Sequence, residues 1–194
     1  MTLSLPIGDA ANALLDRNPL ALLIGMVLDQ QIPLEKAFTS PYVLTQRLGH
    51  EPGAAELAGY DPEALIAVFA TPPALHRFPK AMALRVQEVC RVIAERYDGD
   101  AAALWTGAAD GPELLRRISE LPGFGRQKAQ IFTALLGKRC GVRPTGWREA
   151  AGEYGGEQTY RSVADIVDGD SLARVREYKK QLKAGAGAEQ RSGA

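Results

Sequence analysis

The segment Leu121-Pro122-Gly123-Phe124-Gly125-Arg126-Gln127-Lys128-Ala129 decides the fold, because it predicts two helices joined by a tight hairpin. Pro122 ends the helix before it, and the apolar positions within 131–135 restart helical periodicity after it. At Gly123 and Gly125 the chain can adopt positive φ values, since glycine has no Cβ to clash there. A helix that begins directly after such a hairpin presents unpaired backbone N–H groups and the positive end of its dipole. The segment therefore predicts an anion site, for which phosphate is a natural ligand.

Positive charge gathers around this hairpin, although the chain as a whole is neutral, with 23 basic and 23 acidic residues. Residues 1–120 hold 10 basic and 15 acidic side chains, whereas residues 121–148 hold basic side chains and no acidic one. Because attraction to phosphates dominates nucleic-acid affinity, this clustering favours a polyanion partner that is contacted locally. The alternative is that the hairpin is only a turn between two packed helices.

Length and composition indicate a globular protein without a metal cluster. The chain has 194 residues, of which 46% are apolar. Its two cysteines, Cys90 and Cys140, are too few for a four-cysteine iron–sulfur or zinc site and are typical of a reduced cytosolic protein. No signal peptide is visible, and the apolar run 20–28 is too short to span a bilayer. We therefore expect a cytoplasmic protein with no cofactor, metal or membrane partner.

The rest of the chain shows helical patterns and no convincing alternating strand. Helices are expected over about residues 20–31, 33–48, 61–70, 80–97, 112–119, 126–137 and, as a basic helix, 171–183. Ser40-Pro41 is expected to interrupt the second of these. We predict an all-α protein with one domain over residues 1–184, formed by two helical lobes with the hairpin at 121–129. A disordered tail is expected over 185–194.

The hairpin segment resembles the helix-hairpin-helix of the base-excision DNA glycosylase (HhH-GPD) superfamily, which includes endonuclease III and the adenine-mismatch and 3-methyladenine glycosylases. Three further stretches are similar to that superfamily in the same order: 23–31, which ends in Gln-Gln, 78–99, and 114–121. The resemblance covers about residues 18–140 and is strongest for a small bacterial family without assigned chemistry. It implies a two-lobed helical DNA-glycosylase-like fold. It also implies base-excision DNA repair, with hydrolysis of the N-glycosidic bond of a damaged or mismatched base.

The resemblance also implies which residues contact DNA. They belong to the hairpin or to the Gln-Gln pair: Gly123, Gly125, Arg126, Gln127, Lys128, Gln30 and Gln31. Gln31 matches the glutamine that reaches into the duplex near the extruded base in that superfamily. Without the resemblance, the two amides are solvated groups at a helix end. The expected partner is double-stranded DNA with a damaged or mismatched base, bound by a monomer associated with the nucleoid.

The sequence departs from the superfamily at the position of its catalytic aspartate. That position falls on Thr145, and no aspartate lies between residues 121 and 160. A carboxylate suits the positive charge that develops on the sugar, and threonine cannot supply it. Glu149 is our first candidate for the missing carboxylate and Asp29, beside the glutamines, is the second. Both can instead be solvated charges.

The superfamily's lysine nucleophile is also missing in register. Its position falls on Gln127, and Lys128 lies about 100° further round the helix, so we expect it to face away from the pocket. Met26 stands where adenine-mismatch enzymes carry a glutamate that acts as an acid. The resemblance therefore implies a monofunctional glycosylase without β-lyase activity. The alternative is a non-catalytic DNA-binding module that kept the scaffold and lost the chemistry.

Overall fold

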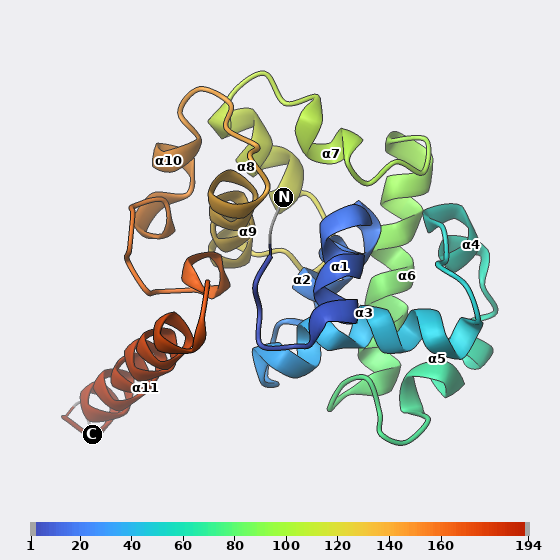
Figure 1. Cartoon of the computed structure of the whole chain (residues 1–194), viewed down its shortest axis with the longest axis horizontal. Helices are drawn as coiled ribbons and strands as arrows, with labels where there is room; N and C mark the ends of the chain where they lie inside the picture. The colour runs from blue at the N-terminus through green and yellow to red at the C-terminus, as the bar shows by residue number, and fades with distance from the viewer. Residues whose placement is uncertain (1–2, 193–194) are drawn as a thin grey trace.

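The computed structural model describes residues 3–192, in which helices are the only regular secondary structure (Figure 1). The predicted all-α class is therefore confirmed for this part of the chain. The α-helices are α1 (Asp9–Arg17), α2 (Pro19–Leu28), α3 (Leu34–Leu48), α4 (Ala54–Gly59), α5 (Pro62–Ala70), α6 (Pro79–Arg96), α7 (Ala103–Thr106), α8 (Gly111–Ser119), α9 (Arg126–Arg139), α10 (Trp147–Ala150) and α11 (Gly169–Ser192). Two 3-10 turns, η1 (Gly152–Tyr154) and η2 (Val163–Asp165), lie between α10 and α11.

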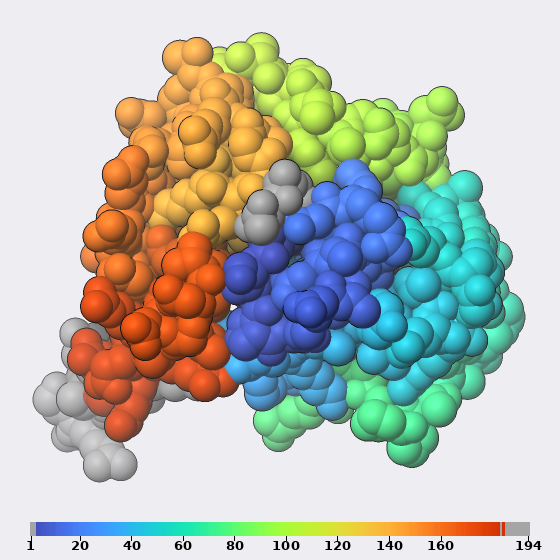
Figure 2. All heavy atoms as spheres, viewed as in Figure 1, coloured from blue at the N-terminus to red at the C-terminus, as the bar shows by residue number. Residues whose placement is uncertain are grey.

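Helices α1 to α6 pack against one another, while α8, α10, η1 and η2 pack around α9 (Figure 1). Figure 2 shows the N-terminal segment, in blue, between the C-terminal half of the chain and the helices that follow α2. The buried apolar side chains of both groups belong to one continuous cluster, which includes Leu22 of α2, Cys90 of α6 and Phe132 of α9. The arrangement brings α2 and α9, which are far apart in the sequence, to the same core.

Helix α2 is apolar on all sides, and every residue from Leu20 to Leu28 is buried, as expected for a core helix. It begins where the sequence indicates, because the Asn18 side chain accepts a hydrogen bond from Ala21 N at 3.0 Å and Pro19 occupies the first turn. No single helix in residues 3–192 is long and apolar enough to cross a membrane; α1 and α2 have that length and composition only as a pair bent by 114°.

Most predicted helices are confirmed, with differences of one or two residues at their ends for α5, α6, α8 and α9. Two other expectations for these helices are wrong. Helix α2 ends at Leu28, three residues early, because Asp29 leaves the helical conformation with ψ +71°. Helix α3 runs without a break through Pro41, since Ser40 and Pro41 are buried and tertiary packing outweighs the local cost of proline. Because α2 ends at Leu28, Gln30 and Gln31 lie in the turn that follows it.

Helix α11 continues through Ser192, so residues 185–192 are helical where the sequence predicted a disordered tail. The alanines at positions 184, 186 and 188 favour a helix, but the glycines at 185 and 187 oppose it, so local propensity does not account for the continued helix. Residues 193 and 194 of the predicted tail lie outside the described residues.

The segment after α9 folds back against α8 and α9 through close glycine contacts. Gly111 N donates to Thr145 O at 2.7 Å, and a Cβ on Gly111 would lie 2.3 Å from the Gly146 carbonyl oxygen. A Cβ on Gly137 would lie 2.2 Å from the ring of Trp147. Because both contacts require glycine, the segment that contains Thr145 and Trp147 is fixed over the C-terminal half of α9.

Candidate functional site

A cleft of about 1040 Å³ opens where the C-terminal end of α2 meets the N-terminal end of α9. Its walls come from residues 26–33, residues 123–131, Arg77 before α6 and Lys179 on α11. The cleft thus brings together eight of the residues singled out from the sequence: Asp29, Gln30, Gln31, Gly123, Gly125, Arg126, Gln127 and Lys128. Glu149 is not among its lining residues.

The hairpin leaves backbone N–H groups without an acceptor at the rim of this cleft. Phe124 N donates to Leu121 O at 3.1 Å, so that amide is satisfied. Within residues 3–192, the N–H groups of Gly123, Gly125 and Arg126 have no such partner, and Gly125, the N-cap of α9, receives no side-chain cap. Both glycines are exposed. The first turn of this 14-residue helix therefore presents free donors and the positive end of its dipole to the cleft.

Only one of the two hairpin glycines uses the positive φ that glycine allows. Gly123 has φ +80°, whereas Gly125 has φ −70° and ψ 169°. Gly125 has the extended backbone that is usual for an N-cap residue. A Cβ on Gly125 would meet no atom within 4 Å, whereas one on Gly123 would lie 2.7 Å from the Arg85 guanidinium. Gly125 therefore faces open space in front of the helix end.

Lys128 lines the cleft, contrary to the expectation that it faces away. Its Nζ donates to Val27 O at 2.7 Å, one of the last carbonyls of α2. Helical side chains lean toward the N-terminus, and this long one reaches back to stabilise the negative end of α2. Burial lowers the pKa of Lys128 to about 8, while the nearby Asp29 carboxylate raises it. Lys128 therefore connects the two walls of the cleft.

Asp29 is the one carboxylate among the cleft-lining residues in the described part of the chain. It is the C-cap of α2, and its N–H donates to Gly25 O at 3.0 Å. Burial raises the pKa of Asp29 above its ordinary value of 3.8, and the ammonium groups of Lys179 and Lys128 lower it. Burial in the cleft therefore favours the protonated carboxyl of Asp29, and the two neighbouring cations only partly offset that effect.

The two glutamines lie differently in the turn after α2. The carbonyl of Gln30 lies 2.9 Å from Nε2 of the buried His76, whose Nδ1 accepts a hydrogen bond from Phe78 N at 3.0 Å. Burial lowers the pKa of His76 and so favours the neutral ring. In that ring Nε2 carries the proton and donates to the Gln30 carbonyl, while Nδ1 accepts from Phe78 N. Gln31 is exposed and has φ +57°, a conformation that is uncommon and strained for a residue other than glycine. The turn holds Gln30 in place and leaves the Gln31 side chain at the surface.

Glu149, the first candidate for the catalytic carboxylate, lies outside the cleft. It is exposed on α10, which is fixed over the C-terminal half of α9 by the Gly137–Trp147 contact. The cleft is at the other end of the same helix, and a 14-residue helix is about 20 Å long. Counting along the sequence from the hairpin cannot detect this fold-back. Asp29, the second candidate, is the carboxylate that the fold brings to the cleft.

Two further cationic residues of the cleft come from outside the hairpin and the turn after α2. Arg77 lies in the non-helical segment before α6, where no local pattern marks it. Lys179 belongs to the basic helix expected at 171–183, whose pattern fits either a solvated face or a contact with the DNA backbone. An ion pair between Arg176 and Glu35 docks α11 against α3, and Lys179 then reaches the cleft. Arg77 and Lys179 thus reach the cleft through packing between segments that are distant in the sequence.

Comparisons with known proteins add no assignment to this site. No family model, no curated protein and no solved structure matches the chain. Within the described residues, no group of three or more His, Cys, Asp or Glu side chains is placed to hold a metal ion.

Proposed function

We propose that this protein is a DNA glycosylase of the helix-hairpin-helix type. It binds duplex DNA through the hairpin at 121–129 and hydrolyses the N-glycosidic bond of a damaged or mismatched base. The main support is that free hairpin N–H groups, Asp29 and Gln31 meet in one cleft. A base must leave the helical stack before an enzyme can reach its glycosidic bond. This function implies a monomer that works in the cytoplasm, associated with the nucleoid.

DNA is held in this proposal by a backbone phosphate at the N-terminal end of α9. The phosphate oxygens accept hydrogen bonds from the N–H groups of Gly123, Gly125 and Arg126, which have no acceptor in the described residues. Arg77, Lys179 and Lys128 supply positive charge along the same cleft. A neutral chain thus attracts a polyanion through a local patch.

Asp29 is the residue that supports the chemistry in this proposal. Water adds to the sugar carbon as the carbon–nitrogen bond breaks, and the base leaves with the bonding electrons and takes up a proton. A carboxylate near the sugar stabilises the positive charge that develops there. Gln31 fills the space that the base leaves in the duplex. Because Gln127 replaces the superfamily's lysine and Lys128 already donates to Val27 O, the enzyme acts without a lyase step.

A panel of duplexes, each with one modified base, tests this function. Release of a free base from at least one duplex supports the glycosylase. Tight, salt-dependent binding without release from any of them supports the alternative, a non-catalytic DNA-binding module. The specific observation that favours the alternative is that Thr145 and Gln127 occupy the superfamily's catalytic positions. Covalent trapping of the protein on DNA by borohydride would contradict the monofunctional assignment.

Gly125→Ala should weaken duplex binding by about tenfold and change folding stability by no more than about 0.5 kcal/mol. The new Cβ meets no protein atom, and the backbone at φ −70° suits alanine. It does occupy the space through which a phosphate oxygen reaches the amides. Fluorescence anisotropy with a labelled duplex and urea unfolding measure the two effects.

Gly53→Ala is the matched control for this change. Gly53 is the N-cap of α4, its φ is −83°, and a Cβ there also meets no atom within 4 Å. It lies outside the cleft. Equal DNA affinities for the two alanine variants would contradict a phosphate grip at the hairpin.

DNA affinity should fall by roughly three- to tenfold as the pH rises through about 8. Lys128 is positively charged below its pKa of about 8 and neutral above it, so attraction to phosphate is lost on the alkaline side. Lys128→Arg keeps the charge at high pH, and its affinity should stay level. Binding titrations between about pH 6.5 and 9.5 at constant ionic strength measure the difference. Parallel decreases for both proteins would exclude Lys128 as the group responsible.

A further inference from the structure

A second pocket, of about 360 Å³, is formed by the last turn of α9, the loop after it, α10 and the segment around η2. It shares no lining residue with the cleft. Its charged lining residues are four cations and two acids: Lys138, Arg139, Arg143, Arg148, Glu157 and Asp165. A pocket with this excess of cations is suited to an anionic ligand.

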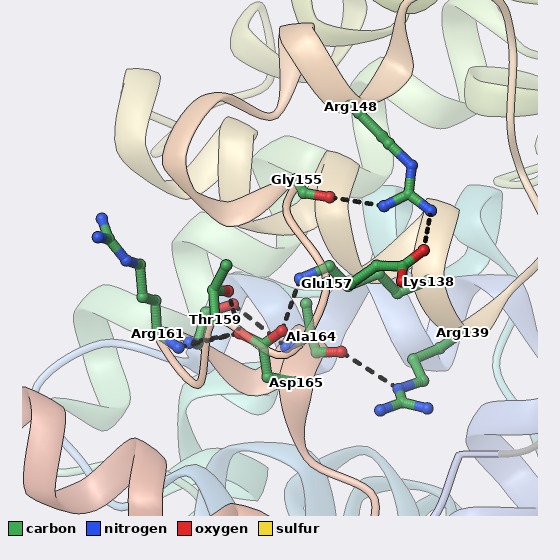
Figure 3. Close-up of polar contacts among 10 residues, drawn as sticks. Lys138, Arg139, Arg148, Gly155, Glu157, Thr159, Arg161, Ala164 and Asp165 are labelled. Atoms are coloured by element: carbon green, nitrogen blue, oxygen red, sulfur yellow. Dashed lines mark hydrogen bonds and ion pairs between the residues drawn. The ribbon is translucent and has the colours of Figure 1, made fainter.

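Both acids in this pocket are already paired. Asp165 Oδ1 accepts from Lys138 Nζ at 2.5 Å, and its Oδ2 accepts from the Thr159 hydroxyl at 3.0 Å (Figure 3). The backbone N–H of Arg161 also donates to Oδ2, at 2.9 Å. Glu157 pairs with Arg148 at 2.9 Å. The acids therefore neutralise Lys138 and Arg148 and leave the other two cations uncompensated.

Arg139 and Arg143 are fixed by the protein without a counter-ion. Arg139 Nε donates to Ala164 O at 3.2 Å, and Arg143 Nε donates to Gly137 O at 2.8 Å. In the part of the chain that the structure describes, neither guanidinium has a carboxylate within 4.0 Å. Burial lowers the pKa of Arg139, as expected for a desolvated cation, although Asp165 raises it. The backbone contacts engage only Nε, so the terminal nitrogens can donate to a ligand.

We propose that this pocket binds a phosphate group between the guanidinium groups of Arg139 and Arg143. Two guanidinium groups can donate paired hydrogen bonds to phosphate oxygens; a phosphomonoester dianion balances both of their charges, and a backbone phosphodiester balances one. The volume is that of a small-ligand pocket, so the phosphate carries a substituent. The source is a free phosphomonoester or a nucleic-acid backbone. The proposal does not depend on the glycosylase function of the cleft.

Calorimetric titration of the full-length protein with inorganic phosphate and with a nucleoside 5′-monophosphate tests the proposal, at an ionic strength matched with chloride. We expect saturable binding that becomes about tenfold weaker or more in the Arg139→Gln, Arg143→Gln double variant. Arg91→Gln should bind like the wild type, because Arg91 is exposed on α6 and does not line the pocket. No binding by the wild type, or equal binding by the double variant, would overturn the proposal.

Two further measurements keep the test independent of the variants' folding and distinguish the sources. Phenylglyoxal modifies arginines, and phosphate should protect Arg139 and Arg143 of the wild type, as read by mass spectrometry. Absence of protection would also overturn the proposal. Displacement of the nucleotide by a short duplex indicates a DNA backbone, whereas simultaneous binding indicates a free phosphomonoester. Gly125→Ala should retain phosphate binding here, so failure of the cleft function would not remove this site.

Discussion

Asp29→Asn should lower the rate of base release from DNA by about 100- to 1000-fold and leave duplex affinity within about threefold of wild type. Asparagine keeps the size of the side chain but removes the full negative charge that opposes the developing cation on the sugar. Binding should change little, because the phosphate is held by the hairpin amides. Single-turnover excision assays on the substrate duplex measure the rate, and anisotropy titrations measure the affinity.

The matched control is Glu149→Gln, at the acid that sequence counting places first and that lies outside the cleft. It should excise at the wild-type rate. An inactive Glu149→Gln with an active Asp29→Asn would reverse the assignment.

Since only ionised Asp29 stabilises a cation and burial raises its pKa, the wild-type rate should rise with pH through a midpoint above 3.8.

Asp165→Asn should destabilise the fold by about 3 to 5 kcal/mol. The side chains of Lys138 and Asp165 are only 11% and 2% exposed, so the variant leaves a buried ammonium without its counter-charge. It also weakens the hydrogen bonds that Asp165 accepts from Thr159 and from the backbone of Arg161. Urea unfolding followed by circular dichroism measures the loss.

A pair on the rim of the same pocket provides the comparison. Glu157 is 80% exposed where it pairs with Arg148, so Glu157→Gln should cost no more than about 0.5 kcal/mol. Removing both buried charges, as Lys138→Met with Asp165→Leu, should recover part of the loss because no unpaired ion remains. A cost for Asp165→Asn as small as that of Glu157→Gln would show that the buried pair does not hold η2 to α9.

Local sequence was sufficient to predict the helices and the hairpin. Proline and cap residues mark helix starts, and the start of α9 at Arg126 follows directly from the two glycines. The early end of α2 was missed, since no residue between Leu28 and Gln31 is a strong helix breaker. The contact between Ser40 and Leu75 O, at 2.8 Å, lies beyond any local pattern and accompanies the unbroken α3.

The candidate site was predictable where its residues share a segment and not where packing assembles it. Glu149 lies outside the cleft and Asp29 lines it, because the chain folds back over the C-terminal half of α9, which a count along the sequence from the hairpin cannot detect. Lys128 was expected to face away because a helical angle describes the Cβ and not the reach of a four-carbon side chain. Arg77 and Lys179 enter the cleft only through tertiary contacts.

Helix α9 places its two ends in two separate electrostatic environments. Its length of about 20 Å is more than twice the Debye length of about 8 Å at physiological salt. Through the solvent, a charge altered near Arg139 is therefore largely screened from the hairpin, and the reverse also holds. Each site can be titrated, neutralised or loaded with its ligand while the other serves as an internal reference within the same molecule.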